Sequence, residues 1–498
     1  MAGFCGIPSA AGIRRRGQRL SGDYREILTA SAEDAAAPLW PPDESEAKGC
    51  SMMDLRDCLE KMEEKGRLAH VTTPVDAAHE LSGVAARLEG GRALMFDRVR
   101  GYDYPVVTGM WWNRDNVAAI FGKPAGELSG LFAEATASLQ KNPVPPILTE
   151  NAPARATTMN EPDLTKIPVP THALLDGGPY FSSCVIIAKD PDTGTRNASI
   201  HRLMVTGKDR LGLLMDAGRH LRNYYERAEA KGKSLEITIN NGAHPAYFVA
   251  ATTPSSAAPI DVDELAVASY LLGEPARLCR SRTVSVEGIA DAQMIMEAEI
   301  LPQVREPEGP FGEVSGYYAI RENRWVVKIR AVTAQKNPII HMLHPGREVW
   351  NGQGLGIEAN LFQTVGKQVK GLKKVYMTHG GSHYHVVLQM DPPYNGMAKN
   401  AILATFAAFS DLQMVTVVNS DVNIYDAEDV ERAMATRCDP ARDIVIVPGA
   451  FGHELNPIVQ GNISAKMGFD CTYPVPKPPA YTRVSFAEVD LSKYHITP

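Results

Sequence analysis

The chain is poor in the features that mark secreted and membrane proteins. It has seven cysteines in 498 residues, and no two of them form a Cys-x-x-Cys pair. An odd number of scattered cysteines, in a long chain without an apolar secretion signal, predicts reduced thiols and a cytoplasmic protein. No apolar run approaches the roughly 18 residues that a membrane-spanning helix needs, so no membrane association is expected.

Positive charges are outnumbered by negative ones, with 51 Lys and Arg against 58 Asp and Glu. The formal net charge is −7 at pH 7, whereas a nucleic-acid-binding protein presents a basic surface. A nucleic-acid partner is therefore not expected, although a local arginine can still bind a small anionic substrate. Hydrophobic residues make up 44% and charged residues 22% of the chain, as in ordinary globular proteins.

The hydrophobic pattern predicts an α/β (α+β) chain of several domains. A disordered extension is expected before the folded sequence. A Pro-rich linker then separates a first α/β domain from a strand-rich region, which predicts a mixed or antiparallel β domain. The expected boundaries are 1–51 for the extension, 52–150 for the N-terminal α/β domain, 151–340 for the β domain, 341–372 for a linker helix and 373–498 for a C-terminal α/β domain.

One short loop, REPEGPFGEVSGYY at residues 305–318, collects three carboxylates around a Pro-Gly frame. Carboxylates this close repel one another, and in one cavity they would raise the pKa of one member until it becomes a general acid near neutral pH. Glu308 and Glu313 are spaced to face one cavity. The alternative is a solvated acidic turn whose glycines only provide bends, and the pattern leaves both readings open.

Together with five other segments, this loop resembles the UbiD family of prenylated-FMN-dependent (de)carboxylases, in its aromatic and heteroaromatic acid branch. The other segments occur in the family's order over roughly residues 53–480. They are DGGPYF (176–181), NASIHRLMV (197–205), AGRHL with LLGEP (217–221 and 271–275), and GNISAKMGFDCTYP (461–474). Several ordered motifs are much more specific than any one of them alone.

The resemblance implies that Asn197, His220 and Glu274 bind a divalent metal, usually Mn²⁺. Oxygen ligands with one imidazole and no thiolate suit Mn²⁺ or Mg²⁺ better than Zn²⁺. By pattern alone, His220 could equally make a local hydrogen bond at a helix start, and Glu274 could decorate a helix end.

The resemblance also implies a catalytic set of Arg202, Glu308 and Glu313. Arg202 would bind the substrate carboxylate and pair with Glu308, and Glu313 would protonate the carbon that loses CO₂. Strict strand alternation, however, puts Asn197 and Arg202 on opposite faces. Both can reach one site only if Asn197 precedes the strand or a bulge intervenes.

A flavin site is implied as well, with residues 151–340 as a split-barrel-like flavin-binding domain and 373–498 as the oligomerisation domain and pocket lid. The segment around Ala250, Ala251 and Thr253 would supply carbonyls to K⁺. The residues assigned to prenylated FMN are Asn197, Ser199, Ile200, His201, Arg202, Arg219, His220, Pro254 and Lys466.

The implied reaction removes CO₂ non-oxidatively from an aromatic, heteroaromatic or α,β-unsaturated acid through a covalent adduct with the cofactor, and it can run in reverse as a carboxylation. Arg347, Trp350 and Asn351 are expected to line the substrate pocket, unless they form a helix entry with a buried Trp. The implied partners are the acid, CO₂, a flavin prenyltransferase that supplies the cofactor, and further copies of the chain in a homodimer or homohexamer.

Two other functions compete with this one. A non-catalytic flavin- or metal-binding assembly protein would need the metal set, but it has no use for Arg202, Glu308 and Glu313 together. A metal-dependent hydrolase built on His383 and His385 lacks further ligands at a fitting spacing. The decarboxylase therefore accounts for more of the residues than either alternative.

Overall fold

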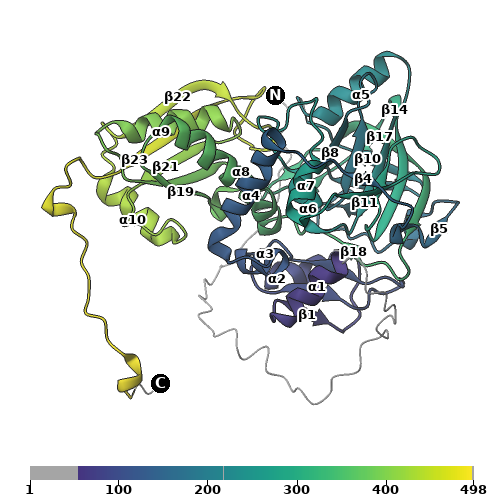
Figure 1. The fold of residues 1–498 in the computed structure, drawn as a ribbon, viewed down its shortest axis with the longest axis horizontal. Coiled ribbons are helices and arrows are strands. Elements are labelled where there is room, and N and C mark those ends of the chain that lie inside the picture. The colour runs from purple at the N-terminus through teal and green to yellow at the C-terminus, as the bar shows by residue number, and fades with distance from the viewer. Residues whose placement is uncertain (1–53, 217, 496–498) are drawn as a thin grey trace, which may run out of the picture. The chain divides into compact units, whose positions relative to one another are not determined.

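A computed structural model describes residues 54–216 and 218–495. Over these residues the chain forms a mixed α/β fold with helices and five sheets (Figure 1), as the sequence predicted. The predicted disordered extension at 1–51 lies outside the described residues, and the expected domain boundaries stay predictions.

The first helix begins where a side chain caps its free amides. Asp54 accepts hydrogen bonds from the amides of Arg56 and Asp57, and the Asp57 carboxylate accepts one from the Asp54 amide, which forms a capping box. In α1 (Leu55–Glu64), the apolar residues lie on one side of the helix, and all of them are buried. The amphipathic spacing in the sequence therefore predicts both the helix and its buried face.

A four-stranded sheet, in the order β1-β2-β3-β18, forms the N-terminal part of the chain. Its last strand comes from far along the sequence and pairs in parallel with β3. The elements of this part are β1 (Leu68–Val71), α2 (Glu80–Leu88), β2 (Ala93–Phe96), β3 (Val106–Thr108), α3 (Arg114–Phe121), α4 (Leu128–Lys141) and β18 (Ile340–His341).

The central part is a nine-stranded sheet in which every pairing is antiparallel. Its long path runs β6-β9-β10-β17-β14-β11-β7-β8, and β5 adds to β17. The strands are β5 (Thr157–Met159), β6 (Tyr180–Phe181), β7 (Val185–Lys189), β8 (Arg196–Ile200), β9 (Leu203–Gly207), β10 (Arg210–Leu213), β11 (Leu235–Asn241), β14 (Met294–Glu308) and β17 (Glu322–Ala334).

Three helices and two small sheets accompany the central strands. The helices are α5 (His220–Ala230), α6 (Pro245–Ala251) and α7 (Leu265–Leu272). Almost every residue of α6 and α7 is buried, as expected for helices that are apolar on all sides. The small sheets comprise β4 (Ile147–Leu148), β12 (Arg277–Cys279) and β13 (Gly288–Ile289), and the hairpin β15 (Phe311–Gly312) with β16 (Tyr318–Ala319).

A long helix, α8 (Arg347–Gln368), connects these parts to the C-terminal sheet. It packs against α4, α6 and the first strand of that sheet. Glu348 in its first turn is fully buried and accepts hydrogen bonds from Thr108 Oγ1 and the Gly109 amide, both at 2.7 Å. These bonds fix the start of α8 against the end of β3.

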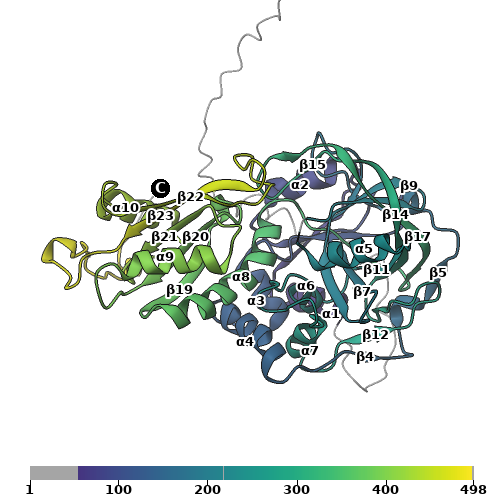
Figure 2. The same ribbon diagram turned by 90° about the horizontal axis from the view of Figure 1, so that it is seen from above.

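The C-terminal part is a five-stranded sheet in the order β19-β20-β21-β23-β22. Its three inner strands are parallel and its two edge strands are antiparallel to their neighbours, and Figure 2 shows α9 lying along this sheet. The elements are β19 (Leu372–Met377), β20 (His385–Met390), α9 (Met397–Ala408), β21 (Met414–Val418), α10 (Ala427–Arg437), β22 (Ile444–Phe451) and β23 (Ile463–Cys471). Among the described residues, no helix combines the length and apolarity needed to cross a membrane.

Candidate functional site

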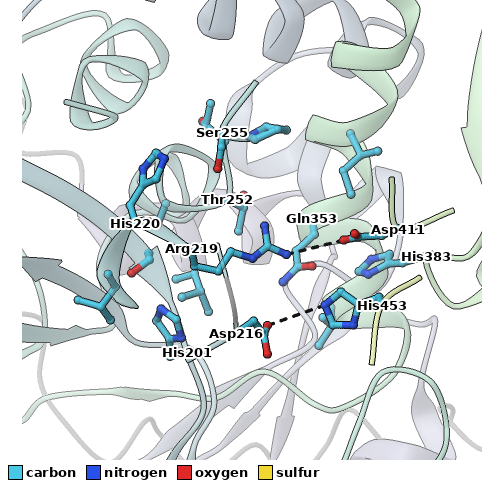
Figure 3. Close-up of a pocket in the computed structure, with 18 of the residues that line it drawn as sticks. His201, Asp216, Arg219, His220, Thr252, Ser255, Gln353, His383, Asp411 and His453 are labelled. Atoms are coloured by element: carbon cyan, nitrogen blue, oxygen red, sulfur yellow. Dashed lines mark ion pairs between the residues drawn. The ribbon is translucent and has the colours of Figure 1, made fainter. Parts of the chain in front are cut away.

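A cavity of about 270 Å³ opens between the central strands, α8 and loops of the C-terminal part (Figure 3). Its walls come from β8, the segment before α5 with the first turn of that helix, the end of α6 and the loop after it, the start of α7, the loop at 313–314 and the first half of α8. The C-terminal part adds the segments around His383, Asp411 and His453. The cavity therefore brings together side chains that lie more than 250 residues apart.

Three polar side chains meet at one end of this cavity. Asn197 lies on β8, His220 is the first residue of α5, and Glu264 precedes α7. Asn197 Nδ2 donates to Glu264 Oε1 over 2.7 Å, and His220 Nδ1 lies 3.4 Å from the same oxygen. Burial raises the pKa of Glu264, and Asn197 Oδ1 is buried without a hydrogen-bond partner. A carboxylate, an imidazole and an unpartnered amide oxygen fit a hard divalent cation.

The acidic member of this group corrects the sequence-based assignment. The resemblance assigned Glu274 to the metal, but Glu274 follows Gly273, the C-cap of α7, whereas Glu264 is the N-cap of the same helix. Eight helical residues, about 12 Å, separate the two ends, and only the Glu264 end lies at the cavity. Two glutamates that flank one apolar helix look alike in sequence. Only the direction in which α7 runs from the cavity distinguishes them.

Arg202 contacts both catalytic carboxylates predicted from the sequence. Its Nε and Nη2 donate to Glu308 Oε1 and Oε2 over 3.1 and 3.0 Å, and its Nη1 forms an ion pair with Glu313. Glu308 is fully buried, while Glu313 lines the cavity. Glu308 therefore lies behind the arginine, and Glu313 faces the space where a ligand would bind.

The conflict between Asn197 and Arg202 disappears because one continuous strand does not hold both. β8 ends at Ile200 and β9 begins at Leu203, so Arg202 lies in the break between them. Strand alternation does not apply across that break. Asn197 itself lies within β8, so of the two arrangements that the sequence allowed, the one with Asn197 before the strand is not found, and the interruption falls between the two strands instead.

The acidic loop divides into two environments. Glu308 ends β14 and is buried. The following Gly309 adopts a φ of +92°, a backbone conformation that glycine reaches easily because it has no Cβ atom. Glu306, by contrast, is partly exposed and pairs with Arg210. The solvated-turn alternative therefore describes Glu306, but it does not describe Glu308 or Glu313.

Most of the predicted flavin-binding residues also line the cavity: Ser199, Ile200, His201, Arg219 and Pro254. Ser199 Oγ and His201 Nε2 are buried without hydrogen-bond partners. The His201 Nδ1 atom lies 3.0 Å from the Leu214 carbonyl, and burial lowers the pKa of His201 to about 4, so Nε2 of the neutral ring is left as an acceptor. Unpartnered donors and acceptors along one wall fit a ligand rich in both, as a flavin is. Ala251 and Thr253 of the expected K⁺ segment line the cavity, and Ala250 is buried.

Lys466 does not reach this cavity. It lies on β23 with 4% of its surface exposed, and its Nζ donates to the carbonyls of Ser410 and Leu412, both over 2.5 Å. Burial lowers the pKa of the amine. A buried ammonium must be satisfied, and these carbonyls satisfy it, so Lys466 supports the loop that carries Asp411 to the cavity.

The residues predicted to line the substrate pocket face elsewhere. Trp350 Nε1 donates to the Val314 carbonyl over 3.1 Å, and Asn351 Nδ2 donates to the Trp112 carbonyl over 2.8 Å. Arg347 is exposed at the start of α8. The cavity instead receives Val349, Gln353 and Ile357 of the same helix. The helix-entry alternative describes this segment better. The prediction chose residues on one face of α8, and the cavity is lined by a neighbouring face of the same helix.

Two ion pairs that sequence reasoning missed cross the cavity. Arg219 Nη2 lies 3.7 Å from Asp411 Oδ2, and His453 Nε2 lies 3.8 Å from Asp216 Oδ2 (Figure 3). Each pair joins the loop before α5 to the C-terminal part. The partners in each pair lie about 200 residues apart or more, and Asp411 and His453 stand in segments without a motif, so no local signal could have paired them.

The hydrolase hypothesis gains no support from the described residues. His385 Nε2 is 2.9 Å from Thr416 Oγ1. Burial lowers the pKa of His383 to about 4. Within residues 54–216 and 218–495 no group of three His, Cys, Asp or Glu side chains is arranged to bind a metal, and the group at Asn197 contains only two such residues.

Models of known protein domains match three consecutive stretches of the chain. The N-terminal, Rift-related and C-terminal domains of 3-octaprenyl-4-hydroxybenzoate carboxy-lyase (UbiD) match residues 59–135, 147–348 and 352–471. The anhydromevalonate phosphate decarboxylase of Methanothermobacter thermautotrophicus is 34% identical over 439 residues, which cover 87% of this chain and all of that protein.

Solved structures give the same relationship. The UbiD-class enzyme HmfF from Pelotomaculum thermopropionicum, in complex with FMN, is 40% identical with a TM-score of 0.84, over 89% of this chain and 100% of that one. An evolved dimeric form of HmfF in complex with prFMN has a TM-score of 0.80 at the same identity and coverage. The 3,4-dihydroxybenzoic acid decarboxylase of Enterobacter cloacae, without ligand, is 31% identical with a TM-score of 0.82, over 88% and 98% of the two chains. The chain belongs to the UbiD family of carboxy-lyases.

Proposed function

We propose that the protein is a prenylated-FMN-dependent decarboxylase acting on a small aromatic, heteroaromatic or α,β-unsaturated carboxylic acid. The observation that carries this proposal is the arrangement of Arg202 between a buried Glu308 and a cavity-facing Glu313. The complexes of HmfF with FMN and prFMN support the choice of cofactor.

The reaction leaves an electron pair on an sp² carbon, and no protein side chain accepts such electrons. Prenylated FMN, when bound, supplies that electron sink. Ser199, Ile200, His201, Arg219 and Pro254 would bind the flavin. Asn197, His220 and Glu264 would hold Mn²⁺ at the adjoining end of the cavity, and the Ala250–Thr253 segment would hold K⁺.

The protein's own residues would orient the acid and deliver a proton. Arg202 binds the substrate carboxylate through Nη1, because Nε and Nη2 are occupied by Glu308. That carboxylate would displace Glu313 from the arginine and add a like charge beside it, which favours the protonated form of Glu313. Glu313 then gives its proton to the carbon that has lost CO₂ and takes a new proton from water.

The cavity favours a compact substrate. Beyond the residues that would bind the flavin, its lining includes apolar side chains at Val349, Ile357 and Phe409, with polar groups at Gln353 and His383. A single ring with one or two polar substituents suits such a lining. Because decarboxylation is reversible, the same site would carboxylate the product at high CO₂. A flavin prenyltransferase would supply the cofactor, and we expect a homodimer or homohexamer.

The test is to express the chain together with a flavin prenyltransferase. The mass of the bound cofactor, the manganese content and CO₂ release from a panel of aromatic and unsaturated acids are then measured. The proposal expects prenylated FMN and turnover of at least one acid, with turnover lost in Glu313→Gln at unchanged cofactor content. Cofactor and metal bound without turnover of any acid would instead support a non-catalytic binding protein.

A further inference from the structure

The catalytic loop is supported from behind by residues 173–181, here named the supporting segment. Asp176 Oδ1 accepts a hydrogen bond from the Gly312 amide, and its Oδ2 accepts one from the Ala173 amide, both over 2.8 Å. The Gly177 amide donates to the Pro310 carbonyl over 2.8 Å. The supporting segment therefore bonds to the loop on both sides of Phe311.

The two backbones approach so closely that a side chain would not fit between them. A Cβ atom on Gly177 would lie 2.3 Å from the Gly309 carbonyl oxygen and 3.2 Å from Met204 Cε. Such a contact would push the loop away from the supporting segment. The close approach of the catalytic loop therefore explains why the first glycine of the DGGPYF motif, Gly177, carries no side chain.

Tyr180 is the member of the segment that touches the catalytic set. Its hydroxyl donates to Glu308 Oε1 over 3.0 Å and lies 3.3 Å from the Pro310 carbonyl. Its ring centroid is 4.4 Å from that of Phe311, whose ring in turn lies 5.3 Å from the Arg202 guanidinium carbon. Burial raises the pKa of Tyr180, so the phenol keeps its proton and remains a donor.

These contacts decide which nitrogen of Arg202 remains for Glu313 once the other two are bound to Glu308. Glu308 accepts Tyr180 on Oε1 and Arg202 on both oxygens, and it is fully buried. The phenol fixes the rotation of the carboxylate, and the carboxylate fixes the plane of the guanidinium through two parallel bonds. Nη1 is then the nitrogen that pairs with Glu313, which lines the cavity.

We propose that Tyr180 and Asp176 are positioning residues for the decarboxylation, although neither touches the reacting atoms. Tyr180 sets the orientation of the Glu308–Arg202 pair, and Asp176 sets the place of Glu313 by fixing the Gly312 amide. This inference rests on the proposed function, since it assigns the two residues to the proton-delivery machinery. A purely structural role would change stability without a specific effect on turnover.

A matched pair of variants separates these roles. Tyr225 is as buried as Tyr180 and also contacts a glutamate that pairs with an arginine: its hydroxyl bonds to Glu229 and accepts from Arg305 Nη1 over 2.9 Å. None of these three residues lines the cavity. Tyr180→Phe and Tyr225→Phe therefore remove the same chemistry inside and outside the site.

The expected result for the holoenzyme is a fall in kcat of about tenfold in Tyr180→Phe, because a hydrogen bond to a charged group is lost. KM, the content of bound flavin and the melting temperature should stay near those of Tyr225→Phe, whose kcat should equal the wild-type value. Equal kcat in all three proteins, while the wild type turns over, would overturn the role of Tyr180 and leave the proposed function standing.

A measurement without cofactor tests Asp176. Hydrogen exchange of the peptide covering 309–318 should be faster in Asp176→Ala than in the wild type. Asp176→Asn, which keeps one acceptor oxygen, should be intermediate. Exchange at wild-type rates in both variants would overturn the role of Asp176. Because it needs neither cofactor nor substrate, this measurement still tests whether Asp176 anchors the loop if the wild type turns over no acid, in which case the proposed function fails for its own reason.

Discussion

At the scale of single residues, the two glutamates that flank α7 provide a direct test of the metal site. Glu264 contacts Asn197 and His220, whereas Glu274 lies at the other end of the helix. We expect Glu264→Gln to weaken Mn²⁺ binding by at least about 100-fold, since losing a residue that binds the metal should cost more than losing one that only orients a metal ligand. Glu274→Gln should bind like the wild type, and metal content after dialysis against Mn²⁺ measures both. Loss of metal in Glu274→Gln alone would restore the original assignment.

A second residue-scale prediction concerns Arg202, which uses three nitrogens to reach two carboxylates. A lysine cannot reproduce that fork, so Arg202→Lys should leave the buried Glu308 carboxylate poorly paired. We expect turnover to fall by more than about 100-fold, as for loss of a group that acts in the transition state. The free energy of unfolding should fall by about 3 kcal/mol, as for a broken buried ion pair. Steady-state kinetics and urea denaturation measure the two effects.

The same loop offers the control for this variant. Arg210 pairs with Glu306, but both side chains are at least one third exposed. Exposed pairs contribute about 1 kcal/mol or less, so Arg210→Lys should leave both turnover and the denaturation midpoint nearly unchanged. If Arg210→Lys were as damaging as Arg202→Lys, the difference in burial between the pairs would not explain the result.

At the scale of elements, the sequence predicts most of what periodicity controls. The spacing of apolar residues indicates α1, and the dense alternating strands between 180 and 334 indicate the antiparallel sheet. The break between β8 and β9 left no sequence signal, because His201 and Arg202 look like a continuation of the strand. The sequence-based prediction of which face of α8 meets the cavity was also wrong, since the face that a helix turns to a site depends on the elements it packs against.

The first turn of α8 carries a testable titration. Burial raises the pKa of Glu348 from its ordinary value near 4.5 to about 7. A carboxyl whose pKa is higher in the folded than in the unfolded state favours the folded state at low pH, and this advantage is lost as pH rises from about 5 to 7. Between pH 5 and 8, the melting temperature of the wild type should therefore fall further than that of Glu348→Gln. A difference between the two proteins that stays constant with pH would contradict this assignment.

At the scale of the whole molecule, the site depends on segments that are distant in sequence. Asp216 and Arg219 of the central part meet His453 and Asp411 of the C-terminal part across the cavity. Motifs identify the Asn197, His220 and Glu308 regions because their residues are locally clustered. The C-terminal contacts have no such clustering, so three-dimensional packing alone identifies them. Lys466 shows the reverse, since its motif matched but its amine is used for internal support.

One buried ion pair on α8 connects the N-terminal and C-terminal parts of the described chain. Glu358 pairs with Arg114 of α3 and accepts a hydrogen bond from the Met377 amide of β19 over 2.9 Å. The Arg114 guanidinium also lies 5.4 Å from the ring centre of Tyr425. Because Glu358 is 3% exposed, removing its charge would leave Arg114 poorly compensated in a buried environment.

We therefore expect Glu358→Gln to lower the free energy of unfolding by about 3 kcal/mol and to speed cleavage by a protease between α8 and β19. The reason is that the C-terminal sheet loses its polar link to α3 while its apolar contacts remain. Glu80→Gln is the control, because the Glu80–Arg100 pair is half exposed on both sides and should contribute about 1 kcal/mol or less. Thermal melting with limited proteolysis measures both variants. If Glu358→Gln melts and resists protease like Glu80→Gln, the apolar packing of α8 against α4 and β19 holds the parts together without the ion pair.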